Sequence, residues 1–296
     1  MTNQDALRQT LFYTLQPLLL LIVLGNWYLD PSREITYLLT VVFVQLTLGF
    51  SEHFLPARPA WTTRAREKSR NAIFVIVLSI IAFSVADLYR NLLANPLAAF
   101  RASAGIDVWP HQWPLLVQLF MVFFLSELLW YWMHRAEHRW RLVWRLSGHG
   151  SHHSFKKLGA LNFGLNHPLE YFLIVLPAAL VELTFGVGAA AAGAAILGVT
   201  QASIAHANIS LNTSWIGLLF TTNKYHICHH SAVLEQSNTN YGCSAIIWDR
   251  IFGTFLDQTI DEAGTGPTEP SMWEKFLMPI REPEDTAIAP AARLDS

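Results

Sequence analysis

Four apolar runs of about twenty residues constrain the fold of this chain more than any other feature. They cover residues 12–29, 35–55, 72–92 and 113–133. A helix of ~20 apolar residues crosses the hydrocarbon core of a bilayer. Only 14% of residues are charged, whereas soluble proteins have about 25%. The first run lacks an Ala-x-Ala cleavage site and a strongly basic leader, so we expect an uncleaved helix. The sequence therefore predicts an all-α integral membrane protein with four transmembrane helices.

A fifth apolar stretch, residues 171–205, predicts a helical hairpin. Its thirty-five residues exceed one span and fall short of two full ones unless the helices are tightly joined. Gly186 and Gly188 suit the bend, because glycine adopts positive φ readily. The Ala-rich segment 189–195, with Gly193 inside it, allows close helix approach. The hairpin would return His206 to the side from which the chain entered.

Basic residues predict which side of the membrane each segment occupies. They gather after the second run and again after the fourth, and cytoplasmic segments are enriched in Lys and Arg. We therefore expect the N-terminus, a His-rich helical cap and the C-terminus on the cytoplasmic side. The predicted organisation is N-terminal transmembrane helices at 1–112, a catalytic region at 113–257 and a soluble tail at 258–296. The basic residues are Arg58, Arg64, Arg66, Lys68, Arg70, Arg135, Arg139, Arg141, Arg145, Lys156 and Lys157.

Histidines form three helical patterns that predict a metal centre. Residues three and four apart share a helix face, so each pattern can direct imidazoles toward one point. Imidazole suits transition metals rather than calcium or magnesium. One HxxxH pattern often arises by chance, but three beside apolar segments favour ligation. Eight ligands suggest two metal ions, without the Glu-rich shell of ferritin-like bundles. The patterns are His134 and His138; His149, His152 and His153; and His226, His229 and His230.

Other polar residues are secondary candidates. His206, at the end of the hairpin, is predicted as a ninth ligand. For His167 a ligand role and a hydrogen-bonding or capping role stay open. Glu127 and Glu170 are candidates to accept a hydrogen bond from a ligand imidazole or to join helices. Cys228 points away from the face of its neighbouring histidines and is expected to pack.

Residues 117–256 resemble the fatty acid hydroxylase/sterol desaturase superfamily of membrane oxygenases. The resemblance rests on the three histidine patterns, on His206-Ala207-Asn208, on Asn240-Tyr241-Gly242 and on the segment Trp248-Asp249-Arg250-Ile251-Phe252-Gly253-Thr254. It implies a non-haem centre of two iron ions that uses O₂ to hydroxylate, desaturate or otherwise oxidise a lipid C–H bond. It also implies nine histidine ligands and places Asn240 near the cluster. The ligands are His134, His138, His149, His152, His153, His206, His226, His229 and His230.

The resemblance further implies a lipid substrate from the bilayer and an external electron donor. The chain has no glycine-rich nucleotide fingerprint and no cysteine set for iron–sulfur or c-type haem. A ferredoxin or cytochrome b5 type protein with its reductase is therefore expected. Basic residues after the fourth run either dock this donor or serve membrane topology. Nucleic-acid binding is not supported, and the oligomeric state stays open.

Three alternatives to a lipid hydroxylase remain at this stage. A desaturase of the same superfamily would use the same ligands. A membrane metal or proton transporter would place ionisable residues near the bilayer midplane, whereas these cluster at one boundary. A scaffold with structural zinc would need only four ligands. Whether the lipid is a fatty acyl chain, a sterol or carotenoid, or an aminolipid is left open.

Overall fold

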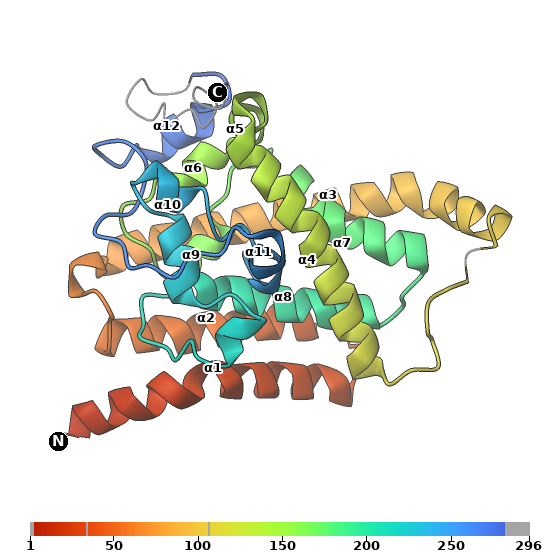
Figure 1. Ribbon diagram of the computed structural model, residues 1–296, viewed down its shortest axis with the longest axis horizontal. Helices are drawn as coiled ribbons and strands as arrows, with labels where there is room; N and C mark the ends of the chain where they lie inside the picture. Colours follow the sequence, from red (N-terminus) through yellow and green to blue (C-terminus); the bar gives the residue numbers. More distant parts are fainter. Residues whose placement is uncertain (1–2, 34, 106, 282–296) are drawn as a thin grey trace.

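The computed structural model describes residues 3–33, 35–105 and 107–281. Within these residues it is helical, with no strand and two isolated bridges, between Pro56 and Ile209 and between Ser231 and Ala263. The predicted all-α fold is confirmed. Four long helices dominate: α1 (Asn3–Leu29), α2 (Thr36–Phe54), α3 (Ala65–Ser103) and α4 (Leu115–Arg139). In Figure 1 the axes of α1, α2 and α3 lie nearly parallel, with α2 running opposite to the other two, and α4 crosses them obliquely.

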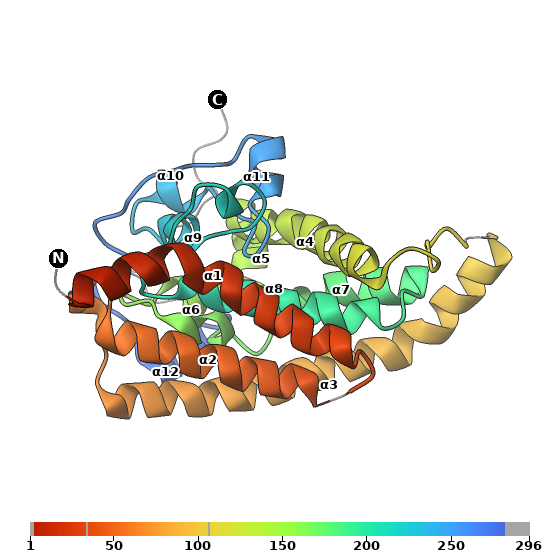
Figure 2. The same cartoon turned by 90° about the horizontal axis from the view of Figure 1, so that it is seen from below.

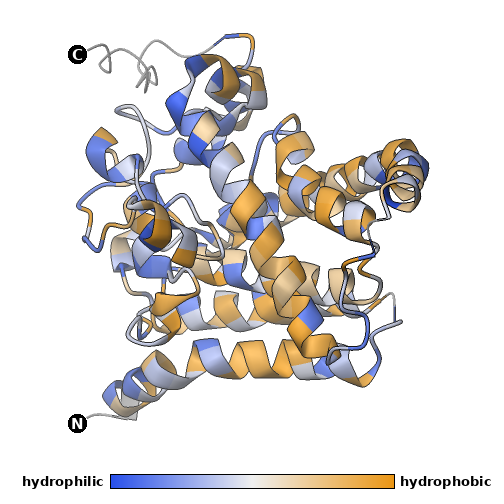
Figure 3. Cartoon of the chain, turned by 45° about the vertical axis from the view of Figure 1, so that its right-hand side comes forward, coloured by the Kyte–Doolittle hydropathy of each residue, from blue (hydrophilic) through white to orange (hydrophobic). Residues whose placement is uncertain are grey.

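The four long helices have the length and apolar surface of membrane spans. In each, at most 28% of the most apolar window is buried inside the protein. Large side chains such as Leu21, Leu46 and Phe50 are nearly 70% exposed, and Figure 3 shows long apolar stretches on these helices. Such surface is stable against lipid and unstable against water. The protein is an integral membrane protein, as predicted.

The third span is longer than the sequence indicated. It was expected at 72–92, but α3 runs for 39 residues, from Ala65 to Ser103. Arg66, Lys68 and Arg70 therefore lie in its first turns rather than in a loop. The helix begins where Glu67 accepts a hydrogen bond from the backbone N–H of Arg64, at 3.4 Å. Lys and Arg are good helix formers, so hydropathy alone underestimated the helix.

The predicted hairpin is present and forms the centre of the bundle. Its helices are α7 (Tyr171–Phe185) and α8 (Ala190–His206). Gly186 and Gly188 adopt φ of 67° and 63° at the bend, as glycine allows. Helix α8 packs against α1, α2 and α4. At Gly193 a Cβ atom would lie only 2.6 Å from Cζ2 of Trp27, so a small residue is required there.

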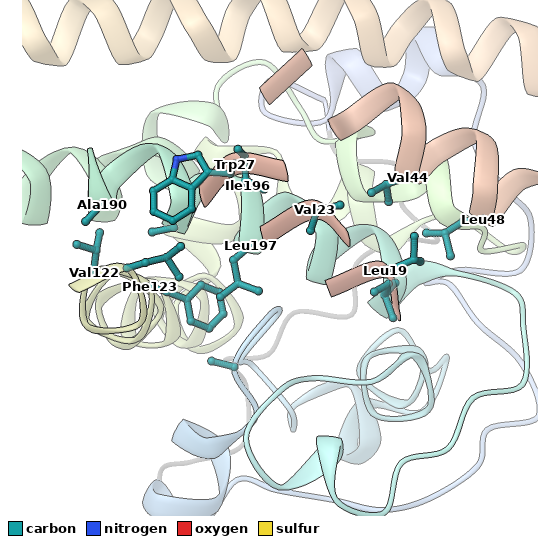
Figure 4. Close-up of a cluster of buried hydrophobic side chains, with 14 of the residues drawn as sticks. Leu19, Val23, Trp27, Val44, Leu48, Val122, Phe123, Ala190, Ile196 and Leu197 are labelled. Carbon is teal, nitrogen blue, oxygen red and sulfur yellow. The ribbon is translucent and has the colours of Figure 1, made fainter. Parts of the chain in front are cut away.

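The main hydrophobic core joins α1, α2, α4 and α8. In Figure 4, Trp27, which is 1% exposed, lies beside Ile196 of α8, and further along the same core Leu48 of α2 lies beside Leu19 of α1. Because lipid tails are as apolar as these side chains, close van der Waals packing rather than transfer from water holds the helices together. This core fixes the end of α4, which carries His134 and His138, and the end of α8, which carries His206. Its residues include Leu19, Val23, Val44, Leu48, Val122, Phe123, Ile196 and Leu197.

Short helices form a cap over one end of the bundle, in the left half of Figures 1 and 2. Polar residues gather there in Figure 3. The cytoplasmic placement of this cap stays a prediction. Its elements are α5 (Arg141–Ser147), α6 (His149–His153), η2 (Ala160–Gly164), η3 (Ile216–Leu218), α9 (Asn223–His229), α10 (Leu234–Ser237), α11 (Ile247–Phe252) and α12 (Met272–Leu277), and η1 (Pro59–Trp61) links α2 to α3.

The segment expected to be a soluble tail is part of this cap as far as it is described, to residue 281. The N–H of Thr265 donates to the carbonyl of His153, and that of Gly264 to the carbonyl of His230, both at 2.8 Å. Ile260 and Met278 are buried. The proline-rich composition therefore marks a packed extension that covers the histidine helices rather than a separate tail. The remainder of the expected tail lies outside the described residues.

Candidate metal centre

All nine candidate histidines come together in two adjoining clusters. Each imidazole is at most 5% exposed. Within each cluster, one ring nitrogen per residue lies within 4.8 Å of the others. The rings of His153 and His230 stack at 4.4 Å where the clusters meet. The first cluster is His134, His138, His149, His153 and His229, and the second is His152, His206, His226 and His230.

Each HxxHH triplet is divided between the two clusters, which corrects the expectation that a triplet points at one place. His149 and His153 join the first cluster and His152 the second, while His226 and His230 join the second. On a helix, positions i and i+4 differ by about 40° and positions i+3 and i+4 by about 100°. The outer pair of each triplet therefore shares a direction, and the middle histidine faces the neighbouring cluster.

Backbone and side-chain acceptors fix the first cluster's imidazoles. Nδ1 of His134 lies 2.6 Å from the carbonyl oxygen of Tyr241, and Nδ1 of His229 lies 2.7 Å from that of Thr239. Nδ1 of His138 lies 3.2 Å from Oδ1 of Asn238. A carbonyl only accepts, so the proton of each neutral ring sits on Nδ1. Each Nε2 therefore presents a lone pair to the cluster.

The facing lone pairs fit a bound cation. Nε2 of His149 lies 3.0 Å from Nε2 of both His134 and His138. Nε2 of His229 lies 3.2 Å from Nε2 of His134. Two nitrogens about 2.1 Å from one ion and at right angles would be about 3.0 Å apart. Lone pairs at this distance repel unless a cation lies between them, so the donor set fits a metal ion.

In the second cluster, which has four histidines, the Nε2 atoms also face one another at close distances. Nε2 of His206 lies 3.0 Å from that of His226 and 3.2 Å from that of His152. His230 follows at 3.2 Å from His226. Nδ1 of His206 donates to the carbonyl of Ala202, one turn earlier in α8, at 2.8 Å. The position of His206 is thus set by the hairpin, and its Nε2 faces the other three rings.

Burial keeps these rings neutral. It lowers the pKa of the histidines in α6 and α9, and neighbouring imidazoles lower it further. Burial penalises the charged form of a histidine. The imidazoles therefore stay unprotonated at neutral pH, which is the form that binds metals.

Two buried carboxylates stand behind His149. Oε1 of Glu170 lies 2.8 Å from Nδ1 of His149, and Oε2 of Glu137 lies 3.8 Å from the same atom. Glu137, Glu170 and the ring are each at most 1% exposed. Burial and then the charge of Glu137 raise the pKa of Glu170. A carboxylate that holds the far nitrogen of a ligand imidazole orients the ring and strengthens its donor atom. Sequence reasoning identified Glu170 and missed Glu137, although it is an acidic residue at the end of a membrane helix.

A loop at residues 238–242 supplies the acceptors for three first-cluster rings. Asp249 holds this loop, because its carboxylate accepts the N–H groups of Tyr241 and Gly242 at 2.7 Å. Asn240, at φ 54°, donates to the carbonyls of Tyr225 and Leu256. Asn240 thus ties the loop to its surroundings and touches no imidazole by hydrogen bond. The positioning residues Asn238, Thr239 and Asp249 were not identified from the sequence, although Asp249 belongs to a quoted motif.

The remaining candidates lie beside the clusters. His167 belongs to neither cluster, because its Nε2 bonds to the carbonyl of Phe276 and its Nδ1 accepts the N–H of Leu169. Glu127 accepts the N–H of Ser244 at 3.1 Å rather than an imidazole proton. Cys243, next to Ser244 in the chain, was not identified as a candidate from the sequence. Its Sγ lies 4.0 Å from Nε2 of His226.

The fold and the site define an integral membrane protein with two buried clusters of imidazoles that could hold metal ions. Comparisons with known proteins make the class specific. Residues 119–254 match the model of the fatty acid hydroxylase family. The match covers nearly half of the chain and agrees with the resemblance to the fatty acid hydroxylase/sterol desaturase superfamily that the histidine motifs indicated.

Three relatives illustrate the superfamily. Ornithine lipid hydroxylase OlsE of Rhizobium tropici is 28% identical over 233 residues, which are 75% of this chain and 66% of that protein. Alkylglycerol monooxygenase of Danio rerio is 26% identical, over 57% of this chain and 38% of the relative. Very-long-chain aldehyde decarbonylase GL1-7 of Oryza sativa subsp. japonica is 31% identical, over 46% of this chain and 22% of the relative. The match therefore spans about two thirds of the first relative and under half of the others. No solved structure matches the chain.

Proposed function

We propose that this protein is an O₂-dependent lipid hydroxylase with two iron ions held by its nine buried histidines. The observation that carries the proposal is the pair of adjoining imidazole clusters, five residues and four, at the end of a membrane bundle. Relatives of the chain include a lipid hydroxylase and a monooxygenase. Zinc has no accessible redox change, so oxidative chemistry favours iron among the metals that bind imidazole.

In this proposal the protein binds the iron ions, orients the lipid and shields the site from water. Nε2 atoms of the first cluster hold one ion and those of the second cluster hold the other. The iron ions supply the activation of O₂ and the oxidising power for the C–H bond. The ring of Trp130 stacks on His134 at 5.2 Å, and Trp144 meets the edge of His149 at 5.1 Å. These indoles keep water from the first cluster, which limits side reactions.

We further propose a polar-headed membrane lipid as the substrate class. An aminolipid is favoured because ornithine lipid is named in a relative matched over three quarters of this chain. The exposed apolar helices keep the protein within the source of such lipids. The lipid would enter from the bilayer and place its reactive carbon beside the histidine clusters.

Two electrons per turnover would come from a ferredoxin or cytochrome b5 type donor on the cytoplasmic side. Arg145 and Lys156 are less suited to docking than the sequence suggested. The guanidinium of Arg145 binds the carbonyls of Pro279 and Ile280 at 3.0 Å, and Nζ of Lys156 binds the carbonyl of Gly264 at 2.9 Å. Arg139 and Lys157 are the better candidates for charge steering.

The test is single turnover by purified protein that has been loaded with iron and chemically reduced, so that the iron supplies the two electrons, in lipid nanodiscs that contain candidate aminolipids. The proposal predicts O₂ consumption and a product heavier by one oxygen atom, derived from ¹⁸O₂. A product lighter by two hydrogens would show a desaturase instead. Metal flux into proteoliposomes without O₂ consumption would identify a transporter and refute the proposal.

A further inference from the structure

A cavity of about 340 Å³ lies between the first turns of α1 and the end of α2. This volume falls within the ~300–1,000 Å³ of small-molecule sites. Leu11, Leu15, Leu55 and Ile209 are among its apolar lining, and none of the nine clustered histidines lines it. The cavity is therefore separate from the metal centre.

The lining of the cavity combines apolar side chains with one positively charged side chain, that of Arg8. Arg8 lies at the cavity, together with the polar groups of Gln9 and Ser210. Arg8 and Ser210 are exposed, whereas Leu15 and Ile209 are buried. An apolar groove that ends at an exposed guanidinium matches an acyl chain with an anionic headgroup, because Arg pairs with phosphate through two parallel hydrogen bonds.

The position of the cavity agrees with the headgroup level of a bilayer. Its walls are the ends of two membrane helices, at the first turns of α1 and the last turn of α2. The chain that leaves the cavity at Ala57 continues directly into Arg58, Arg64 and Arg66. Basic segments beside membrane helices attract anionic lipids.

We propose that this cavity binds one anionic phospholipid of the surrounding membrane, with its phosphate at Arg8 and the first part of an acyl chain along Leu11, Leu55 and Ile209. The lipid is a bound component rather than the substrate. The proposal does not depend on the reaction assigned to the metal centre.

A bound lipid would brace the segment that follows His206. Ile209 forms a bridge with Pro56, and the N–H of Ala57 donates to the carbonyl of Asn208 at 3.0 Å. Glu52 accepts the N–H groups of Asn208 and Ala160 at 2.8 Å and 2.7 Å. A ligand that binds only the folded state raises its stability. Anionic lipid should therefore raise the melting temperature of the protein.

The experiment measures lipid binding to the full-length protein in detergent by native mass spectrometry, with phosphatidylglycerol, phosphatidylcholine and oleate as separate probes. We expect one phosphatidylglycerol to be retained per chain in preference to the other two. Arg8→Gln should weaken this binding roughly three- to tenfold, and Ser210→Trp, at an exposed lining position, should block it. Arg281→Gln, at an exposed arginine outside the cavity and outside the basic segment after Ala57, is the matched control and should bind as the unchanged protein does.

Equal weakening by Arg8→Gln and Arg281→Gln would overturn the proposal in favour of general surface charge. Retention of oleate or phosphatidylcholine in place of phosphatidylglycerol would also overturn it. The same measurement on His229→Ala, which the proposed function predicts to be inactive, should show unchanged lipid binding. An inactive wild-type enzyme that still binds phosphatidylglycerol would contradict the hydroxylase and leave the lipid site intact.

Discussion

Nε2 of His134 and Nε2 of His229 lie 3.2 Å apart, although 95 positions separate the two residues in the chain. Each ring donates its Nδ1 proton to a carbonyl of the loop at 238–242. Two acceptor nitrogens thus face each other in a buried site. The pair brings the C-terminal part of the membrane helix α4 and the short cap helix α9 to one candidate metal position.

Removing one histidine from either cluster should remove one metal ion and leave the other. His229→Ala acts on the first cluster and His230→Ala on the second. We expect each to lower iron from two to about one per chain and to abolish turnover, because both ions serve one reaction. Metal analysis of the purified variants measures this. His53→Ala, at an exposed histidine on α2, is the control and should retain both ions.

Loss of the carboxylate behind His149 should weaken metal binding without removing a ligand. Glu170→Ala leaves Nδ1 of His149 without its partner at 2.8 Å. Such changes typically cost about 10–100-fold in affinity. Competition with a chelator measures the shift. Glu182→Ala, at a half-buried glutamate 3.7 Å from Arg90, should leave affinity unchanged, and an equal effect at both positions would refute the role of Glu170.

Two glycines of α8 should respond differently to the same substitution. In Gly193→Ala the new methyl group would lie 2.6 Å from Trp27, whereas at Gly198 nothing lies within 4 Å. We expect Gly193→Ala to lower the free energy of unfolding by about 1–3 kcal/mol and Gly198→Ala to change it by less than about 0.5 kcal/mol. Thermal unfolding in detergent compares them. Equal melting temperatures would show that α8 does not pack on α1 as described.

Lys275 makes the stability of the cap depend on pH. Burial lowers the pKa of its ammonium group to about 8, against the partly opposing charge of Glu269. The unfolded state then binds more protons than the folded state between about pH 8 and 10.5, so this residue's contribution to stability rises with pH in that window. Relative to Lys275→Met, the wild type should gain about 1–3 kcal/mol from pH 7.5 to 10. A constant difference between the two proteins would contradict this.

The sequence predicted the elements that rest on periodicity and hydropathy. The four spans, the hairpin bend at Gly186 and Gly188, and the assembly of the nine histidines follow from local composition and spacing. The helical step of about 100° between His152 and His153 already indicates that the two rings point in different directions. The sequence does not show that a second cluster of histidines lies in the direction of His152.

Other features depend on contacts that no local pattern encodes. Glu137 of α4 and Glu170, just before α7, reach the same ring of His149 only through the packing of these helices around α6. Asp249 acts through a loop whose backbone carbonyls, not side chains, hold His134 and His229. The packed segment 258–281 resembles a tail because its cap contacts are largely main-chain hydrogen bonds. Hydropathy also missed the polar first turns of α3.

Anomalous diffraction at the iron edge from crystals of the purified protein tests the central claim most directly. Two iron peaks are predicted, one among His134, His138, His149, His153 and His229 and the other among His152, His206, His226 and His230. A single peak, or peaks away from these imidazoles, would contradict a centre of two metal ions shared by the two clusters.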